Sequence, residues 1–186
     1  MLFRSGLVLL VENAGESTLT GAELELTALL ADGFTVSGGL AWLDPEYDNW
    51  DQVDFITGQT QDLSGRKFRD VPEFTANILA QYEFALSGGG SLRLRGDLAY
   101  RDDIYYTNDE VASTFDRLHA DSFTTINAGI TYISADGQWE LGVYGRNLSD
   151  EREIVGGFVV DAFGSTDVAF TPPRRYFVSV KYTGGE

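Results

Sequence analysis

The joins between the apolar runs of this sequence alternate between short and long. With period-2 apolar runs taken as strands, tight polar joins occur at ADG (31–33), SGGGS (87–91) and SADGQ (134–138). The other joins are ENAGEST (12–18) and three long, acidic, aromatic stretches at 45–69, 102–119 and 148–171. A β-meander that crosses a membrane has short turns on one side of the bilayer and long loops on the other. The alternation therefore predicts a membrane-spanning meander.

Eight strand candidates lie between or beside these joins. They cover about residues 2–11, 21–30, 34–42, 74–86, 92–101, 122–133, 139–146 and 175–182. Their length, about ten residues, is what a tilted strand needs to cross a bilayer. We predict an all-β antiparallel meander of about eight long strands, which is either part of a transmembrane β-barrel or a small closed barrel.

The two faces of the predicted strands differ in chemistry. Leu24 and Leu26 alternate with Glu23 and Glu25, and the other strands repeat this pattern. The apolar faces often end in aromatic residues, as the interfacial girdles of a membrane barrel require: Trp42, Tyr82, Tyr100, Tyr132, Trp139, Tyr176 and Tyr182. The alternation itself does not say which face is inside. A soluble, lipocalin-like barrel with its apolar face inward, binding a small apolar ligand, therefore stays open as the alternative.

Composition narrows the classes of partner. The chain has 29 acidic and 13 basic residues and a net charge of −16, with no basic stripe to offset it, so we expect no nucleic-acid partner. Cysteine is absent, which excludes disulfides and thiolate metal sites. No run of 18 apolar residues is present, so no transmembrane helix is expected.

No catalytic pattern in the sequence is complete. Ser64 and Lys67 have the S-x-x-K spacing of acyl-serine enzymes, but neither an S-D-N nor a K-T-G segment accompanies them. His119, the only histidine, has Asp121 and Ser122 nearby, yet sequence neighbours seldom form a triad. The acidic residues of 44–51 lack the glycine and the glutamate of an EF-hand loop. We therefore predict no enzyme, no metal site and no cofactor.

Six aromatic residues of the long joins are candidate ligand contacts. They are Trp50, Phe55, Tyr105, Tyr106, Phe158 and Phe163. Aromatic rings in such loops can stack on a ligand. They can equally pack the loops against one another, and the sequence leaves both interpretations open.

Five short motifs carry a resemblance to a known family. They are Asn13-Ala-Gly-Glu-Ser17 with the following Thr20–Leu26, Val71-Pro-Glu-Phe74, Tyr100-Arg101 with Ile104–Tyr106, Tyr144-Gly-Arg-Asn-Leu-Ser-Asp150, and Pro172-Pro-Arg-Arg-Tyr176. In this order and spacing they resemble the C-terminal barrel strands of TonB-dependent outer-membrane receptors.

The resemblance implies a location and a function. It makes residues 1–186 a single barrel segment, about the last eight strands of such a receptor, in the outer membrane of a Gram-negative bacterium and in contact with its lipid. The family takes up scarce ligands such as siderophores, vitamins or saccharides, and the TonB system acts through a plug domain. We find no counterpart of the plug, so the segment is not expected to transport alone, and we expect the chain to begin within a longer one. Open sheet edges would also permit self-association.

Overall fold

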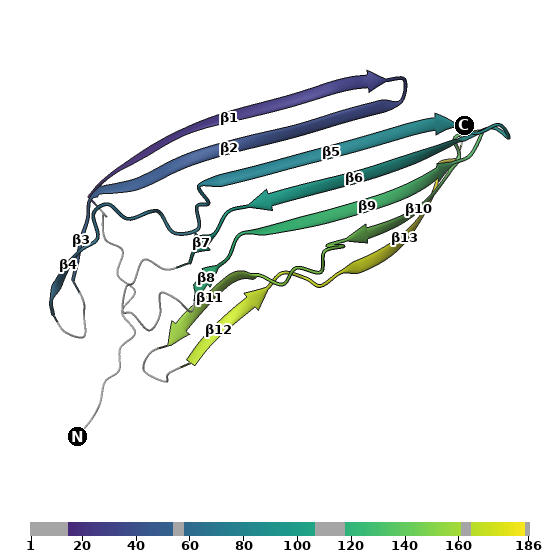
Figure 1. The fold of residues 1–186 in the computed structure, drawn as a ribbon. Helices are drawn as coiled ribbons and strands as arrows, with labels where there is room; N and C mark the ends of the chain where they lie inside the picture. Colours follow the sequence, from purple (N-terminus) through teal and green to yellow (C-terminus); the bar gives the residue numbers. More distant parts are fainter. Residues whose placement is uncertain (1–14, 54–57, 107–117, 161–164, 185–186) are drawn as a thin grey trace.

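The structure is a computed structural model, and it describes residues 15–53, 58–106, 118–160 and 165–184. Seven strands form one antiparallel sheet in the order β1-β2-β5-β6-β9-β10-β13. They are β1 (Glu16–Ala31), β2 (Phe34–Asn49), β5 (Phe74–Ala85), β6 (Ser91–Arg101), β9 (Phe123–Ile133), β10 (Trp139–Arg146) and β13 (Arg175–Tyr182). Each strand pairs with the one before it in this order, so the predicted meander is confirmed (Figure 1). No helix among the described residues is long and apolar enough to cross a membrane.

The sheet is open over the described residues. β1 and β13 form its two edges, and no pairing joins them. Of the two forms expected from the sequence, the small closed barrel is therefore wrong for the part of the chain that is described. The first predicted strand, at 2–11, lies outside the described residues.

The short joins lie together at one end of the sheet, beside the end of β13 (Figure 1). In the turn after β5, Gly89 and Gly90 have φ of 85° and 82°, which only glycine adopts without strain. The Leu86 N–H donates to the Gly90 carbonyl oxygen at 3.0 Å and closes this turn. The run of glycines is therefore a hairpin turn, as the sequence predicts.

The long joins contain strands of their own at the other end of the sheet. Each carries a two-stranded hairpin, made of β3 (Asp51–Val53) with β4 (Thr60–Asp62), β7 (Ile104–Tyr105) with β8 (His119–Ala120), and β11 (Ile154–Val160) with β12 (Ser165–Phe170). The sequence did not reveal these hairpins, because their residues do not alternate cleanly between apolar and polar.

The first hairpin of the sheet is longer than the sequence predicts. The β1–β2 ladder continues to the pair Glu16 and Asn49, past Pro45, which lies opposite Leu19. The sequence predicts that this strand ends near residue 42, because a long acidic and aromatic join begins at residue 45. Beyond this point apolar alternation no longer marks the strand, although the backbone ladder continues.

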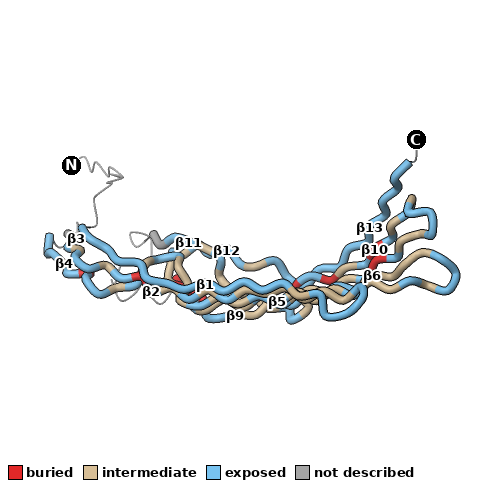
Figure 2. Tube along the Cα trace, turned by 90° about the horizontal axis from the view of Figure 1, so that it is seen from above, coloured by how far each residue is buried: buried red, intermediate tan, exposed pale blue. Residues whose placement is uncertain are grey.

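Each face of the sheet is continuous from strand to strand. In one row across the sheet, Leu26 lies opposite Gly38, then Ile78, Leu98 and Ile126 follow on successive strands. These apolar side chains are exposed in the described structure, with Ile78 at 50%. The tube in Figure 2 is accordingly mostly exposed or half-buried over the strands. The sheet is thus a single layer whose apolar face has no protein covering it among the described residues.

The buried apolar side chains lie in the long joins. They are Leu63, Ile104, Leu118 and Ala120. A soluble sandwich would bury its core between two sheet faces. Here the buried side chains pack the connections at one end of the sheet.

Charged side chains of the polar face pair across neighbouring strands. Arg93 Nε donates to Glu83 Oε2 at 2.8 Å, and Lys181 Nζ donates to Glu140 Oε1 at 2.7 Å. Asn127 Nδ2 donates to Asp97 Oδ2 at 2.6 Å. On this face, several side chains of opposite charge are therefore paired across neighbouring strands.

We expect a charge on the apolar face to be far more costly than the same charge on the polar face. Arginine near the middle of a lipid-facing strand surface costs about 2–4 kcal/mol. Ile78→Arg should therefore lower the free energy of unfolding by about this amount, measured by urea titration of the protein in lipid vesicles. Asn77→Arg, the adjacent residue on the polar face, is the matched control and should change it much less. Equal costs would contradict this assignment of the faces.

The β9–β10 turn provides a pH prediction. Hydrogen bonds from the Ser134 hydroxyl and the Gln138 backbone N–H hold the pKa of the Asp136 carboxyl below its usual 3.8. A lowered pKa in the folded state stabilises the fold above the unfolded-state pKa, and this stabilisation is lost as pH falls through the lower folded value. Ser134→Ala should raise the Asp136 pKa towards 3.8 in a carbon-detected NMR titration. Ser134→Thr keeps the hydroxyl and should leave the pKa low.

Candidate ligand-facing surface

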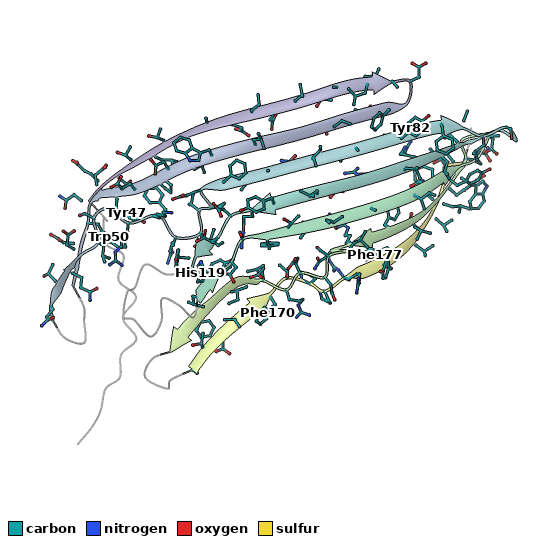
Figure 3. All side chains as sticks on the ribbon, viewed as in Figure 1. Tyr47, Trp50, Tyr82, His119, Phe170 and Phe177 are labelled. Carbon is teal, nitrogen blue, oxygen red and sulfur yellow. The ribbon has the colours of Figure 1, made fainter. Side chains whose placement is uncertain are left out.

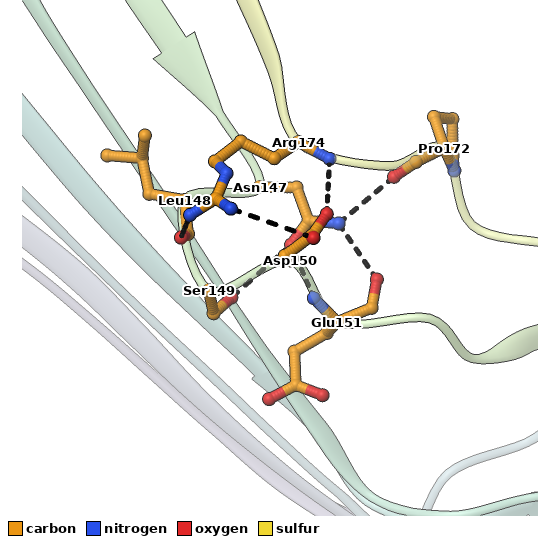
Figure 4. Close-up of polar contacts among 7 residues, drawn as sticks. All are labelled: Asn147, Leu148, Ser149, Asp150, Glu151, Pro172 and Arg174. Atoms are coloured by element: carbon orange, nitrogen blue, oxygen red, sulfur yellow. Dashed lines mark hydrogen bonds and ion pairs between the residues drawn. The ribbon is translucent and has the colours of Figure 1, made fainter.

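Asn147 ties the end of β10 to two other parts of the chain (Figure 4). Its side-chain Nδ2 donates to the carbonyl oxygens of Glu151 at 2.8 Å and Pro172 at 3.0 Å. Its backbone N–H donates to Asn127 Oδ1 on β9 at 2.9 Å. The backbone has φ of 50°, a left-handed conformation that asparagine tolerates better than most residues. Asn147 is only 8% exposed, so its side-chain amide serves this internal connection.

The residues after Asn147 complete this connection. The Ser149 hydroxyl donates to the Thr124 carbonyl oxygen at 3.0 Å. The Arg174 backbone N–H donates to Asp150 Oδ1 at 2.8 Å, and the Arg174 guanidinium lies 3.7 Å from Asp150 Oδ2 (Figure 4). The motifs at 144–150 and 172–176, which are distant in sequence, therefore meet in one hydrogen-bonded cluster that fixes where β13 begins.

A second set of contacts joins β6 to the β11–β12 hairpin. The Tyr106 hydroxyl donates to the Ile154 carbonyl oxygen at 2.9 Å and accepts a long hydrogen bond of 3.4 Å from Arg101 Nη1. The Arg101 guanidinium lies 4.7 Å from the centre of the Phe123 ring, while its buried Nε and Nη2 have no hydrogen-bond partner among the described residues. Tyr106, predicted from sequence as a ligand contact, is engaged here between two connections.

His119 and Tyr105 form the centre of the β7–β8 hairpin. Their rings stack with centroids 4.4 Å apart, and His119 Nε2 lies 3.2 Å from Asp103 Oδ2. His119 Nδ1 is 3.7 Å from Asp121 Oδ1. The histidine is therefore half-buried in a packed hairpin.

The rings of Trp50 and Tyr47 pack with their centroids 4.5 Å apart, and those of Tyr47 and Phe68 with theirs 4.6 Å apart. Figure 3 shows Tyr47 and Trp50 beside one another at the end of the sheet that carries the hairpins. Phe158, on β11, is 59% exposed. Phe55 and Phe163 lie outside the described residues. Of the four candidates described, three thus pack within the connections and Phe158 is open to solvent.

The S-x-x-K pair is not assembled. The Ser64 hydroxyl accepts a hydrogen bond from the Trp50 N–H at 3.1 Å. Lys67 forms an ion pair with Glu73, whose hydrogen bond raises the pKa of the lysine above its usual 10.5. A lysine held in its charged form in this way does not serve as a general base.

A hollow of about 750 Å³ lies on the polar face of the sheet. Its lining comes from β6, β9, β10 and β13, and includes the polar residues Arg95, Asp97, Asn127, Tyr144, Arg146 and Arg175 together with Phe177. A hollow on this side means that the sheet curves around its polar face. The apolar face is therefore the outer one, which is opposite to the lipocalin-like alternative. Sequence analysis missed this site because it depends on strand register.

Comparison with known proteins agrees with this geometry. Residues 3–148 match the family described as "TonB dependent receptor-like, beta-barrel". The chain belongs to this family. TonB-dependent receptors are transporters of the Gram-negative outer membrane and not enzymes, so the predicted family, location and absence of an enzyme are confirmed.

Solved receptors share the fold of this segment. The match to the ferric yersiniabactin uptake receptor FyuA from Yersinia pestis has 19% identity and a TM-score of 0.74, and it covers 91% of this chain and 24% of the receptor. The match to the siderophore receptor PiuA from Acinetobacter baumannii has 22% identity and a TM-score of 0.68, and it covers 90% of this chain and 22% of the receptor. The match to the ferric preacinetobactin receptor BauA, also from Acinetobacter baumannii, has 20% identity and a TM-score of 0.66, and it covers 91% of this chain and 22% of the receptor. The chain thus spans less than a quarter of these receptors.

We expect Asn147 to be a major source of stability at the hairpin end of this sheet. Asn147→Ala removes two donors to carbonyl oxygens, and a typical intramolecular hydrogen bond contributes about 0.5–1.5 kcal/mol. The free energy of unfolding should fall by about 1–3 kcal/mol, measured by urea titration in detergent micelles. Asn49→Ala, an exposed asparagine at the end of β2, is the matched control and should be nearly neutral. A neutral Asn147→Ala would show that the cluster does not hold β13.

Proposed function

We propose that these strands belong to a receptor that imports a ferric siderophore across the outer membrane. The supporting observation is the curved sheet with its polar face inward, which has the fold of three receptors named for siderophores or their ferric complexes. Vitamins and saccharides are the other ligand classes implied by the family. The observed likeness favours the siderophore class.

In this proposal the segment depends on parts outside it. Energy arrives from the TonB system through a plug domain of the full receptor, and the seven strands of the described sheet contribute part of the barrel wall. The short turns face the periplasm, and the hairpins β3–β4, β7–β8 and β11–β12 face the medium. Ligand first meets the chain at these hairpins.

We propose the six aromatic residues of the long joins as ligand contacts, and the structural support differs among them. Phe158 has the best support among those described, because its ring is largely exposed on an outer hairpin. Trp50, Tyr105 and Tyr106 are engaged with neighbouring side chains or backbone, so we propose that they shape the hairpins around the ligand. Phe55 and Phe163 are proposed from their places in the sequence.

We expect deletion of the full receptor gene to impair growth on iron-restricted medium when a suitable siderophore is the iron source. Uptake of radioactive iron bound to that siderophore should fall to the background level, and growth in iron-rich medium should be unchanged. Normal iron uptake, together with a defect on a vitamin or an oligosaccharide, would assign the receptor to that other class.

The receptor gene carrying Phe158→Ala provides a finer comparison within the same assay. Uptake should require a higher siderophore concentration, because an exposed stacking surface has been removed. Val168→Ala, on the paired strand β12, is a control that removes apolar surface from the same hairpin.

A further inference from the structure

Two arginines of the hollow lie directly opposite each other. Arg146 ends β10 and Arg175 begins β13, and the ladder pairs them residue to residue. Both guanidinium groups lie over the same ring, Phe177, at 5.9 Å and 5.7 Å from its centre. Like charges directly opposite in an antiparallel pair destabilise it. The arrangement therefore calls for a negative charge close to both.

The described residues supply no such charge. Neither arginine has an ion pair with a described carboxylate, whereas Arg93 pairs with Glu83 and Lys181 pairs with Glu140 on the same face. Asp97 is the acidic residue in the lining of the hollow. Its Oδ2 already accepts a hydrogen bond from Asn127 Nδ2 at 2.6 Å, and its Oδ1 lies 3.9 Å from Arg95 Nε. In a chain with 29 acidic and 13 basic residues, two adjacent cations without an ion pair among the described residues are unexpected.

The surroundings of the pair suit a small ligand. The hollow measures about 750 Å³, within the usual range of about 300–1,000 Å³ for small-molecule sites. Phe177 and Tyr144 add aromatic surface to its polar lining. The ring of Phe177 also restrains both guanidinium groups through cation–π contacts, which reduces the entropy lost when they bind an anion.

We propose that Arg146 and Arg175 bind a carboxylate group of the transported ligand. The planar guanidinium group matches a carboxylate with two parallel hydrogen bonds, and two such groups on adjacent strands can hold both of its oxygens. This inference rests on the proposed function and narrows it to ligands that carry at least one free carboxylate. An acidic side chain from another part of the receptor is the alternative occupant, and the experiment below distinguishes it.

The test is a calorimetric titration of the full-length receptor in detergent with citrate, a tricarboxylate probe. Wild-type receptor should bind citrate saturably, and Arg146→Gln/Arg175→Gln should weaken binding tenfold or more. Arg146→Lys/Arg175→Lys keeps both charges but loses the planar fork, so binding should be intermediate. Lys181→Gln removes one positive charge from the same strand pair at its other end and should leave the affinity unchanged.

Two outcomes would overturn the proposal. One is equal citrate affinity in wild type and in the double glutamine variant. The other is no saturable citrate binding by wild type together with a lower melting temperature of the double glutamine variant, which would show that the receptor neutralises the pair with its own carboxylate. Normal growth of the deletion strain with every siderophore would instead refute the proposed function, whatever the citrate result.

Discussion

The unbroken ladder of backbone hydrogen bonds from β1 to β13 is the constraint on which this structure depends. In hydrocarbon no water can satisfy a backbone N–H or carbonyl group, so each strand must pair with its neighbours. The registers meet this requirement, pairing the strands over as many as 16 residues. The outer edges of β1 and β13 remain unpaired among the described residues.

The ladder also separates the chemistry of the two faces. Because successive side chains point to opposite sides, register alone aligns Leu26, Ile78 and Leu98 on one face and brings charged partners together on the other. The sheet therefore needs no buried core, and the buried apolar side chains lie in the connections. There Tyr106 and Asn147 bind backbone carbonyl oxygens of other segments and hold the hairpins at the end of the sheet.

The adjoining ends of β10 and β13 carry both the hydrogen bonds of Asn147 and the proposed carboxylate site. Asn147 closes β10 and fixes the start of β13, and the residues just inside these ends, Arg146 and Arg175, face the hollow as an opposed pair. A shift of one residue in this register would turn both arginines towards the apolar face. The cluster around Asn147 is therefore also what keeps the proposed carboxylate site on the inner side.

The sequence by itself determined the meander, the two ends of the sheet and the alternation of its faces, because period 2 and turn composition are local properties. The motif at 144–150 was likewise readable as a strand end. Tertiary structure decided which face is inside, that the sheet is open over the described residues, and that the long joins fold as hairpins around Leu63 and Ile104. It also decided the pairing of Arg146 with Arg175. Curvature, packing of connections and cross-strand register all depend on contacts between residues distant in sequence. Alternation along one strand is a local property and does not predict these contacts.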